Sequence, residues 1–442
     1  VITINPFENF TKDAMNTDLS ALCDWLPEEA GEVQHANHEP NDLATIMYTS
    51  GTSGRPKGVM LSHHNLLTNA NSCLQIVSVS QDDLFLSFLP LSHAFERTVG
   101  YYLPLMTGAT VAYARSIQQL QEDLISVRPS VLISVPRIYE RVYAAIHAKL
   151  EKKSAFSRLI FNYAVEVGYS RFEFQQQRGP KKISHLLWPL LNLLVAKEVM
   201  GKLGGQLRLA MAGGAPLSIE VSRMFIGLGL PILQGYGMTE CSPVACVNSI
   251  NNNVPSSVGR AIPGVAVKLD ENNTLLIHGP NVMLGYWNNP EATAATLAPD
   301  GWLNSGDMAR IDGEIITITG RLKEIIVMST GEKIPPADME AAILRDRLFE
   351  QVILIGEGHP YLSVLVVINP DCWEKISRQH NLDLKVGRSV HNKKLEKILL
   401  ERITVQIREF PGYAKIRRVA LALEPWTVEN GMLTPTLKLK RT

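Results

Sequence analysis

The ten residues 49-TSGTSGRPKG-58 begin in the last two residues of an apolar run, 43-LATIMYTS-50, whose length and composition predict a buried strand. Glycines let the backbone N–H groups turn toward an anion, the hydroxyl groups add donors, and Lys57 adds a positive charge. A second predicted strand, 58-GVMLS-62, and the helix expected after it disfavour a bland surface turn. The stretch therefore predicts a turn that binds a polyphosphate.

This turn is not the Walker loop of P-loop nucleotidases. That loop has the pattern G-x-x-x-x-G-K-[ST]. Counting from Gly51, its second glycine would fall at Pro56 and its hydroxyl at Gly58, so both positions fail. The sequence predicts a phosphate-binding turn of another kind.

The pattern around the turn predicts an α/β fold of several subdomains. Strand-like and helical patterns alternate up to about residue 135, whereas residues 137–203 are helical in pattern and predict an insertion. Residues 258–320 hold short β runs separated by glycine, which predicts a small β subdomain. We expect a large domain of layered sheets over residues 1–320 and a smaller, separate α+β domain over residues 325–442.

Composition narrows the function classes. Lys+Arg and Asp+Glu number 43 each among 442 residues, so net charge gives no reason to propose nucleic acid as a partner. The five cysteines include no C-x-x-C pair, and reduced thiols fit a cytoplasmic protein. The N-terminal segment 1-VITINPFENF-10 shows no targeting pattern. The oligomeric state is not predicted.

The most apolar helical stretch is Leu186 to Ala196, which Pro189 and Asn192 interrupt. About 20 residues are needed to span a bilayer, so we expect that this stretch does not span one. A buried helix is the favoured interpretation. The alternative is peripheral membrane association through a surface that lies on the bilayer, for which nearby basic residues speak, namely Lys152, Lys153, Arg158, Lys181 and Lys182.

The turn at 49–58 resembles the phosphate loop of the adenylate-forming (AMP-binding) superfamily. Further signatures of that superfamily follow in order: 213-GGAPL-217, 234-QGYGMTE-240, 301-GWLNSGD-307, 320-GRLKEII-326 and 434-TPTLK-438. The resemblance runs from about residue 40 to the last residue. One such motif would be weak evidence, whereas a series in the family's order is strong.

Within the superfamily the chain resembles the long-chain fatty acyl-CoA synthetases. The segments that carry this resemblance are 89-LPLSHAFER-97, 135-VPRIYER-141, the helical insertion and 427-TVENGMLTPTLKLKR-441. The resemblance implies ATP-dependent activation of a fatty acid to acyl-AMP with release of pyrophosphate, followed by transfer to the CoA thiol. Acyl-acyl-carrier-protein synthetases and acyl-AMP ligases share much of this pattern and stay open as alternatives, as does a non-catalytic nucleotide-binding fragment.

The resemblance assigns a nucleotide site to residues of these motifs: Thr49, Ser50, Gly51, Thr52, Ser53, Gly54, Lys57, Gly213, Gly214, Ala215, Gln234, Gly235, Tyr236, Gly237, Thr239, Asp307 and Arg321. Glu240 and Thr49 would hold Mg²⁺ through hard oxygen atoms. Thr239 would bond the α-phosphate. Tyr236 would present its ring to adenine, and Asp307 would accept hydrogen bonds from the ribose hydroxyls.

The remaining assignments concern the small domain and the acyl side. Lys438 would enter the site on domain closure and bridge carboxylate and α-phosphate; Lys440 would face the same way but lacks the family's spacing. Lys323 lies at the hinge, residues 321–324. Gly331 would admit the CoA arm, and His93 is a candidate between nucleotide and acyl pockets.

The chain departs from the family at three points. Only 48 residues precede Thr49, so we expect the large domain to lack its N-terminal portion. Val327 stands where many relatives carry lysine, and the chain stops at Thr442, soon after Lys438.

Three other enzyme classes do not fit the sequence. A dehydrogenase is excluded because no G-x-G-x-x-G occurs, and a serine hydrolase because no G-x-S-x-G occurs. A phospholipid-type acyltransferase would need an aspartate a few residues after a histidine in an apolar pocket, and no aspartate follows His63, His64 or His93 at that spacing.

Overall fold

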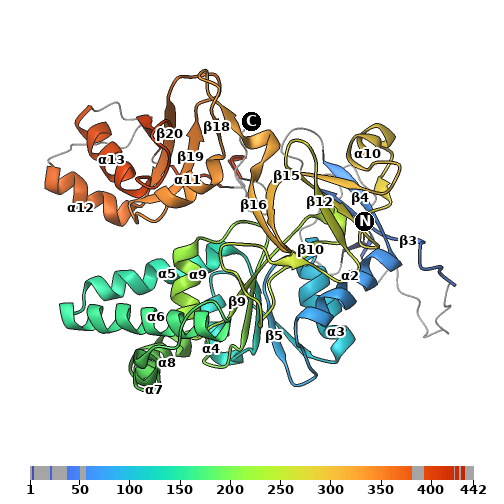
Figure 1. Ribbon diagram of the computed structural model, residues 1–442, viewed down its shortest axis with the longest axis horizontal. Coiled ribbons are helices and arrows are strands. Elements are labelled where there is room, and N and C mark those ends of the chain that lie inside the picture. Colours follow the sequence, from blue (N-terminus) through green and yellow to red (C-terminus); the bar gives the residue numbers. More distant parts are fainter. Residues whose placement is uncertain are drawn as a thin grey trace. The chain divides into compact units, whose positions relative to one another are not determined.

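The computed structural model describes residues 2–3, 20–21, 37–49, 56–380, 393–422, 424–427 and 430–433 (Figure 1). The chain divides into two units, residues 1–42 and 43–442. In the first unit, β1 (Ile2–Thr3) pairs in parallel with β2 (Ser20–Ala21). The second unit holds the sheets and helices that carry the sequence motifs.

The centre of the second unit is a seven-stranded sheet of order β11-β10-β9-β8-β7-β5-β6. Its strands are β5 (Leu84–Ser87), β6 (Thr110–Tyr113), β7 (Val131–Ser134), β8 (Leu209–Ala212), β9 (Ile232–Gly237), β10 (Val244–Val247) and β11 (Arg260–Ala261). Strands β5 to β9 are mutually parallel, and β10 and β11 are antiparallel additions at one edge. The carboxyl ends of β5, β7, β8 and β9 therefore share one edge of the sheet.

Helices cover both faces of this sheet (Figure 1). Alternate side chains of each strand point to opposite faces, so Leu132 and Ile232 join a core with one set of helices, whereas Ile133 and Leu233 join a core with the other. The first set comprises α4 (Leu120–Val127), α5 (Pro136–Glu151), α6 (Ala155–Gln175) and α9 (Ile219–Gly227). The second comprises α2 (His63–Ile76), η2 (Glu96–Tyr102) and α3 (Leu103–Thr107).

Two smaller antiparallel sheets flank the centre. One has the order β14-β4-β3, with β3 (Leu43–Thr49), β4 (Lys57–Ser62) and β14 (Gly285–Tyr286). The other has the order β12-β13-β15-β16, with β12 (Ala266–Leu269), β13 (Thr274–His278), β15 (Leu303–Asp312) and β16 (Ile315–Arg321). Two short helices belong to this region: η5 (Thr239–Cys241) follows β9, and α10 (Pro290–Thr296) lies between β14 and β15.

The C-terminal part has its own core. Its strands are β17 (Ile326–Val327), β18 (Lys333–Ile334), β19 (Phe349–Ile355), β20 (Leu362–Ile368) and β21 (Ile416–Ala422), and its helices are η6 (Leu322–Glu324), α11 (Pro336–Ile343), α12 (Pro370–His380) and α13 (Lys393–Gln406). Met339, Val366 and Ile403 are buried together in this core. The predicted fold class, a large α/β part followed by a smaller α+β part, is confirmed. The boundaries at 320 and 325 stay a prediction.

Local predictions hold where the apolar pattern is strong. The strand predicted from residue 43 forms β3, Leu43–Thr49. The helix expected after β4 forms α2, and the Ser62 hydroxyl caps it by accepting a hydrogen bond from Asn65 N at 3.1 Å. The stretch 137–203 is largely helical: after α6 the chain continues through η3 (Ile183–Leu187), α7 (Trp188–Leu191), η4 (Asn192–Ala196) and α8 (Lys197–Gly201).

The favoured interpretation of Leu186–Ala196 as a buried helix is wrong. It belongs to a continuous helical run of 19 residues, Ile183–Gly201, and only 22% of its most apolar window is buried. By length and composition alone this run is long and apolar enough to cross a membrane. Both sides of this helical run are apolar, so the periodicity of the sequence does not show which side is buried and which is exposed.

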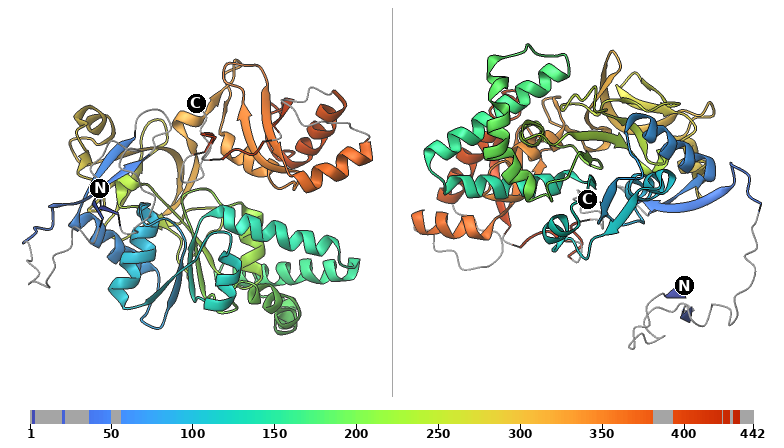
Figure 2. Two further views of the ribbon diagram at one scale, coloured as in Figure 1. Left: turned by 180° about the vertical axis from the view of Figure 1, so that it is seen from behind. Right: turned by 90° about the horizontal axis from the view of Figure 1, so that it is seen from below.

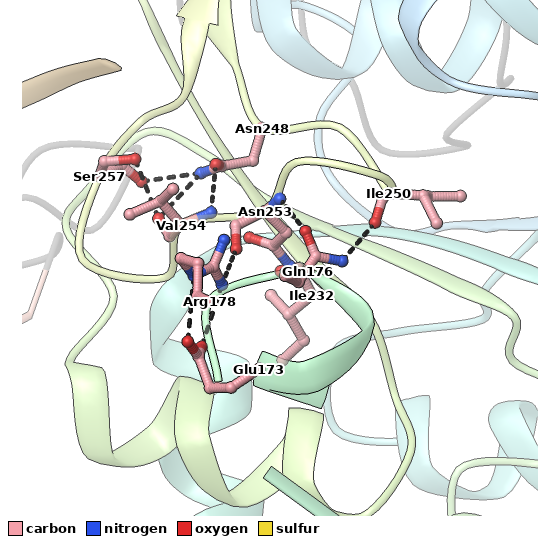
Figure 3. A network of polar contacts seen from close by, with 9 residues as sticks. All are labelled: Glu173, Gln176, Arg178, Ile232, Asn248, Ile250, Asn253, Val254 and Ser257. Carbon is pink, nitrogen blue, oxygen red and sulfur yellow. Dashed lines mark hydrogen bonds and ion pairs between the residues drawn. The ribbon is translucent and has the colours of Figure 1, made fainter. Parts of the chain in front are cut away.

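A polar network fixes the end of α6 to the loop after β10 (Figure 3). Gln176 Nε2 donates to the Ile250 carbonyl at 2.8 Å, and Asn253 N donates back to Gln176 Oε1 at 2.8 Å. Arg178 bonds the Asn253 carbonyl at 2.7 Å and pairs with Glu173. These bonds hold the helical insertion firmly against the loop beyond the central sheet.

Candidate functional site

The predicted phosphate turn joins two paired strands. Strands β3 and β4 are antiparallel, and Thr49 lies opposite Lys57 in the register. This pairing brings the two ends of the turn together. Residues Ser50, Gly51, Thr52, Ser53 and Gly54 lie outside the described part of the chain.

Tyr286 connects this hairpin to Glu240. The Lys57 ammonium lies 4.7 Å from the centroid of the Tyr286 ring, a cation–π contact. The Tyr286 hydroxyl donates a hydrogen bond of 2.8 Å to Glu240 Oε1. The fold supplies this geometry because β14 pairs with β4, with Tyr286 opposite Val59. The structure therefore brings Lys57 and Glu240 to one place.

The Glu240 carboxylate is 8% exposed, and its environment suits a hard cation. Among the residues that the structure describes, Tyr286 is the one hydrogen-bond partner of this carboxylate, and no basic side chain pairs with it. Burial and the charge of Glu240 raise the pKa of Tyr286, so the phenol stays a neutral donor. Among the described residues no ion pair engages Glu240, so its carboxylate could ligate a metal ion.

A second tyrosine–carboxylate pair lies in the same region. Tyr236, at the end of β9, donates a hydrogen bond of 2.6 Å to Asp307 Oδ2, and Arg321 Nε donates to Asp307 Oδ1 at 2.8 Å. Burial and the charge of Asp307 raise the pKa of Tyr236 well above its ordinary value. Each carboxylate oxygen has a further lone pair that a hydroxyl group of a ligand could use. Tyr236, Asp307 and Arg321 form one connected group.

Residues at the carboxyl ends of β8 and β9 complete the edge. Gln234 Oε1 accepts a hydrogen bond of 3.2 Å from Leu217 N, which ties the segment after Gly213, Gly214 and Ala215 to β9. A Cβ atom at Gly237 would overlap the carbonyl oxygen of Pro243, so this glycine is required by the chain's own packing.

The segment that contains His93 packs against the same edge. A Cβ atom at Gly213 would lie 2.9 Å from the ring of Phe95, and Thr98 Oγ1 donates to the Ser242 carbonyl at 3.0 Å, just after η5. His93 Nδ1 accepts from Phe95 N at 3.3 Å. This segment therefore lies between the predicted nucleotide motifs, although the role of His93 stays a prediction.

Glu96, in the same segment, is fully buried. Its Oε1 accepts a hydrogen bond of 2.6 Å from the Ser87 hydroxyl at the end of β5, and its Oε2 has no hydrogen-bond partner among the described residues. Burial raises the pKa of Glu96 to about 7. The carboxyl group of Glu96 therefore titrates near neutral pH at the carboxyl edge of the sheet.

The predicted residues of the small domain are only partly placed. Lys438 lies outside the described residues, and the side chain of Lys323, which is in η6, is not described either. Gly331 has a φ of 92° in the turn between β17 and β18, a conformation that favours glycine. The structure does not test the roles proposed for these three residues.

Two residues of the site, Tyr286 and Glu96, were missed by the sequence analysis. Glu96 lies within the quoted motif 89-LPLSHAFER-97, but a single acidic letter does not reveal that it is buried. Tyr286 meets a partner 46 residues away, and no periodic pattern encodes that contact.

A parallel sheet covered on both faces, with these motifs at its carboxyl edge and a small C-terminal domain, defines an enzyme of the adenylate-forming class. The family model described as "AMP-binding enzyme" matches residues 6–287, and that of the "AMP-binding enzyme C-terminal domain" matches residues 323–418. The chain belongs to the AMP-binding enzyme family, on the branch of the fatty acyl-CoA ligases.

Two relatives illustrate the similarity. The chain is 31% identical to long-chain-fatty-acid–CoA ligase FadD15 of Mycobacterium bovis, over 90% of this chain and 67% of that protein. It is 30% identical to the chloroplastic long-chain-fatty-acid–[acyl-carrier-protein] ligase AEE15 of Arabidopsis thaliana, over 91% of this chain and 60% of that protein. The chain thus spans about three fifths of the length of the first curated relatives that it matches.

A solved structure shows the same fold. The adenylation domain of a carboxylate reductase from Mycobacterium chelonae superimposes with a TM-score of 0.70 at 23% identity, covering 96% of this chain and 62% of that one. At this identity the likeness concerns the fold alone.

We predict that Tyr286→Phe destabilises the protein by about 1–3 kcal/mol, because the buried Glu240 carboxylate loses its neutral donor. Urea unfolding at neutral pH measures the change. Tyr48→Phe is the control: the Tyr48 side chain is on β3 but 67% exposed, so its loss should change stability by less than about 0.5 kcal/mol. An equal, small effect of both substitutions would contradict the described geometry.

The raised pKa of Glu96 predicts a pH-dependent effect on stability. Between pH 4.5 and about 7 the folded state keeps a proton on Glu96 that the unfolded state has lost, so stability falls as pH rises through this window. Between pH 4.5 and pH 8, the free energy of unfolding of Glu96→Gln should therefore rise by on the order of 3 kcal/mol relative to that of the unsubstituted protein. Urea unfolding at several pH values tests this, with the exposed Glu271→Gln as the control. A stability difference between Glu96→Gln and the unsubstituted protein that stays constant with pH would refute the raised pKa of Glu96.

Proposed function

We propose that the chain binds ATP with Mg²⁺ at this site, activates a long-chain fatty acid as acyl-AMP, and transfers the acyl group to the thiol of CoA. The observation that carries the proposal is the convergence of Lys57, Tyr286 and Glu240 beside the pair of Tyr236 and Asp307 at the carboxyl edge of the sheet. Both tyrosines belong to one apolar cluster, so two chemically different sets of groups, one suited to a metal polyphosphate and one to a ribose, lie in the same region.

The proposed reaction has two balanced steps. A carboxylate oxygen of the fatty acid forms a bond to the α-phosphorus of ATP while the bond to pyrophosphate breaks. The thiol sulfur of CoA then forms a bond to the acyl carbon, the bond from that carbon to the phosphate oxygen breaks, AMP leaves, and the thiol proton passes to solvent. The first step concentrates negative charge on phosphoryl oxygens, so it needs cations that are already in position.

The chain's own groups take the following parts in this proposal. Glu240, with Thr49, would hold the Mg²⁺, because its buried carboxylate lacks a basic partner among the described residues. When bound, the ion would neutralise charge on the phosphates. Lys57 would add a second cation, and Asp307, aligned by Arg321, would accept the ribose hydroxyls.

The small domain would complete the site. In this proposal the division into residues 1–320 and 325–442, with a hinge at 321–324, lets Lys438 reach the reacting carboxylate in one arrangement and Gly331 approach the thiol arm in the other. The cytoplasmic location predicted from the cysteines belongs to the same proposal.

A second acceptor is supported by one comparison. The relative AEE15 is named as a ligase for an acyl-carrier protein. Supplying the purified chain with acyl-AMP and either CoA or phosphopantetheinylated carrier protein distinguishes the two. Thioester formation with the carrier protein alone would overturn CoA as the acceptor.

ATP–pyrophosphate exchange with palmitate tests the adenylation step directly. We expect exchange that depends on palmitate and on Mg²⁺. Nucleotide binding without exchange, for any fatty acid in a panel of chain lengths, would instead support the non-catalytic alternative.

We predict that Lys438→Ala lowers pyrophosphate exchange by about 10²–10³-fold, the effect of removing one group that stabilises charge in a transition state. The same variant should still form the thioester from supplied acyl-AMP. Lys440→Ala, two residues away, is the matched control and should retain exchange. Equal loss of both half-reactions in the Lys438 variant would contradict the role of this residue.

A further inference from the structure

The helical run Ile183–Gly201 has two apolar faces. Its inward face is buried in the core beside α6, through Leu191, Val195, Ala196 and Val199. Its outward face consists of six large apolar side chains that are 45–87% exposed: Ile183, Leu186, Leu187, Leu190, Leu193 and Leu194. Their spacing of three and four residues places them on one side of the helix. We call these six residues the outer face.

The outer face is unusual for a helix at the surface of a soluble domain. Such helices normally direct polar residues outward, and a contiguous apolar patch marks a site of interaction. The segment lies at the outer margin of the layer of helices, and the left view of Figure 2 shows it (dark green) at the periphery. No described residue covers enough of the outer face to bury any of its six side chains.

The charged residues that flank the outer face in the sequence are mostly basic. Lys181 and Lys182 precede it, and Lys197 follows it, all exposed. No aspartate or glutamate occurs from residue 174 to residue 197. Glu198, the next acid, lies 3.8 Å from Lys202, which compensates it. A strip of leucines bordered by lysines is complementary to a bilayer with anionic headgroups, where apolar side chains enter the acyl boundary and ammonium groups meet phosphates.

The inward face keeps the run attached to the protein. Trp188 packs so tightly on α6 that a Cβ atom at Gly168 would lie 2.6 Å from its ring. The Arg171 guanidinium lies 5.6 Å from the centroid of the same ring. The end of α6 is held in turn by the network of Gln176 and Arg178 (Figure 3). Spanning a membrane would break these contacts, whereas lying in its surface would keep all of them.

We propose that the outer face docks the chain on the surface of an anionic lipid bilayer, with Ile183–Leu194 lying in the plane of the headgroups. Six large apolar side chains within one short segment supply the apolar contact, and Lys181, Lys182 and Lys197 supply the preference for negative charge. This docking does not rest on the proposed enzymatic function.

Vesicle flotation of the purified chain tests the proposal. The full chain should float with vesicles of phosphatidylcholine and phosphatidylglycerol, more weakly with phosphatidylcholine alone, and less as salt rises. The triple variant Leu190→Ser, Leu193→Ser, Leu194→Ser should lower the partition coefficient at least about tenfold, because three inserted side chains are lost. Lys181→Gln with Lys182→Gln should remove most of the preference for anionic vesicles.

The control is Val405→Ser on α13, a side chain that is 60% exposed but stands outside the outer face. It should float like the unsubstituted chain, and circular dichroism should show that every variant is folded. Three results would overturn the proposal: no flotation of the unsubstituted chain, equal flotation of the triple variant, or a dimer in light scattering that the triple variant abolishes. The last result would identify the outer face as an interface between two copies.

Discussion

The site depends on the buried contact between Tyr286 and Glu240. The tyrosine hydroxyl is a neutral donor at 2.8 Å, so it satisfies one oxygen of the carboxylate without neutralising its charge. The tyrosine ring meanwhile positions the Lys57 ammonium at 4.7 Å. One side chain therefore links the hairpin of the predicted phosphate turn to the end of the central sheet. The same side chain also positions the buried Glu240 carboxylate, the proposed ligand of the metal ion.

Much of the architecture could be predicted from the sequence. Strands such as β7 and β8 are short, fully buried apolar runs between turn signals, and parallel pairing follows from their alternation with helices. The run Ile183–Gly201 shows where this reasoning ends. Apolar residues recur on both of its faces, and only the position of α6 decides which face is buried. Composition alone cannot specify that packing.

The site could be predicted in part for a similar reason. The motifs ending in Gly213 and Gly237 follow β8 and β9 directly, so parallel strands bring them to one edge. The contact of Tyr286 with Glu240 instead requires β14 to pair with β4, more than 220 residues earlier in the chain. The contact of Glu96 with Ser87 requires the helix η2 to fold back over β5. Such partners are specified by tertiary packing, which no local pattern records.

In the proposed function, the metal polyphosphate binds between the turn at 49–58 and Glu240. A crystal structure of the chain with Mg²⁺ and a non-hydrolysable ATP analogue tests it most directly. We expect the phosphates against the turn that begins at Thr49, and the ion about 2.0–2.1 Å from a Glu240 carboxylate oxygen. Phosphates bound elsewhere, or a turn with no nucleotide contact in the presence of saturating analogue, would contradict the account.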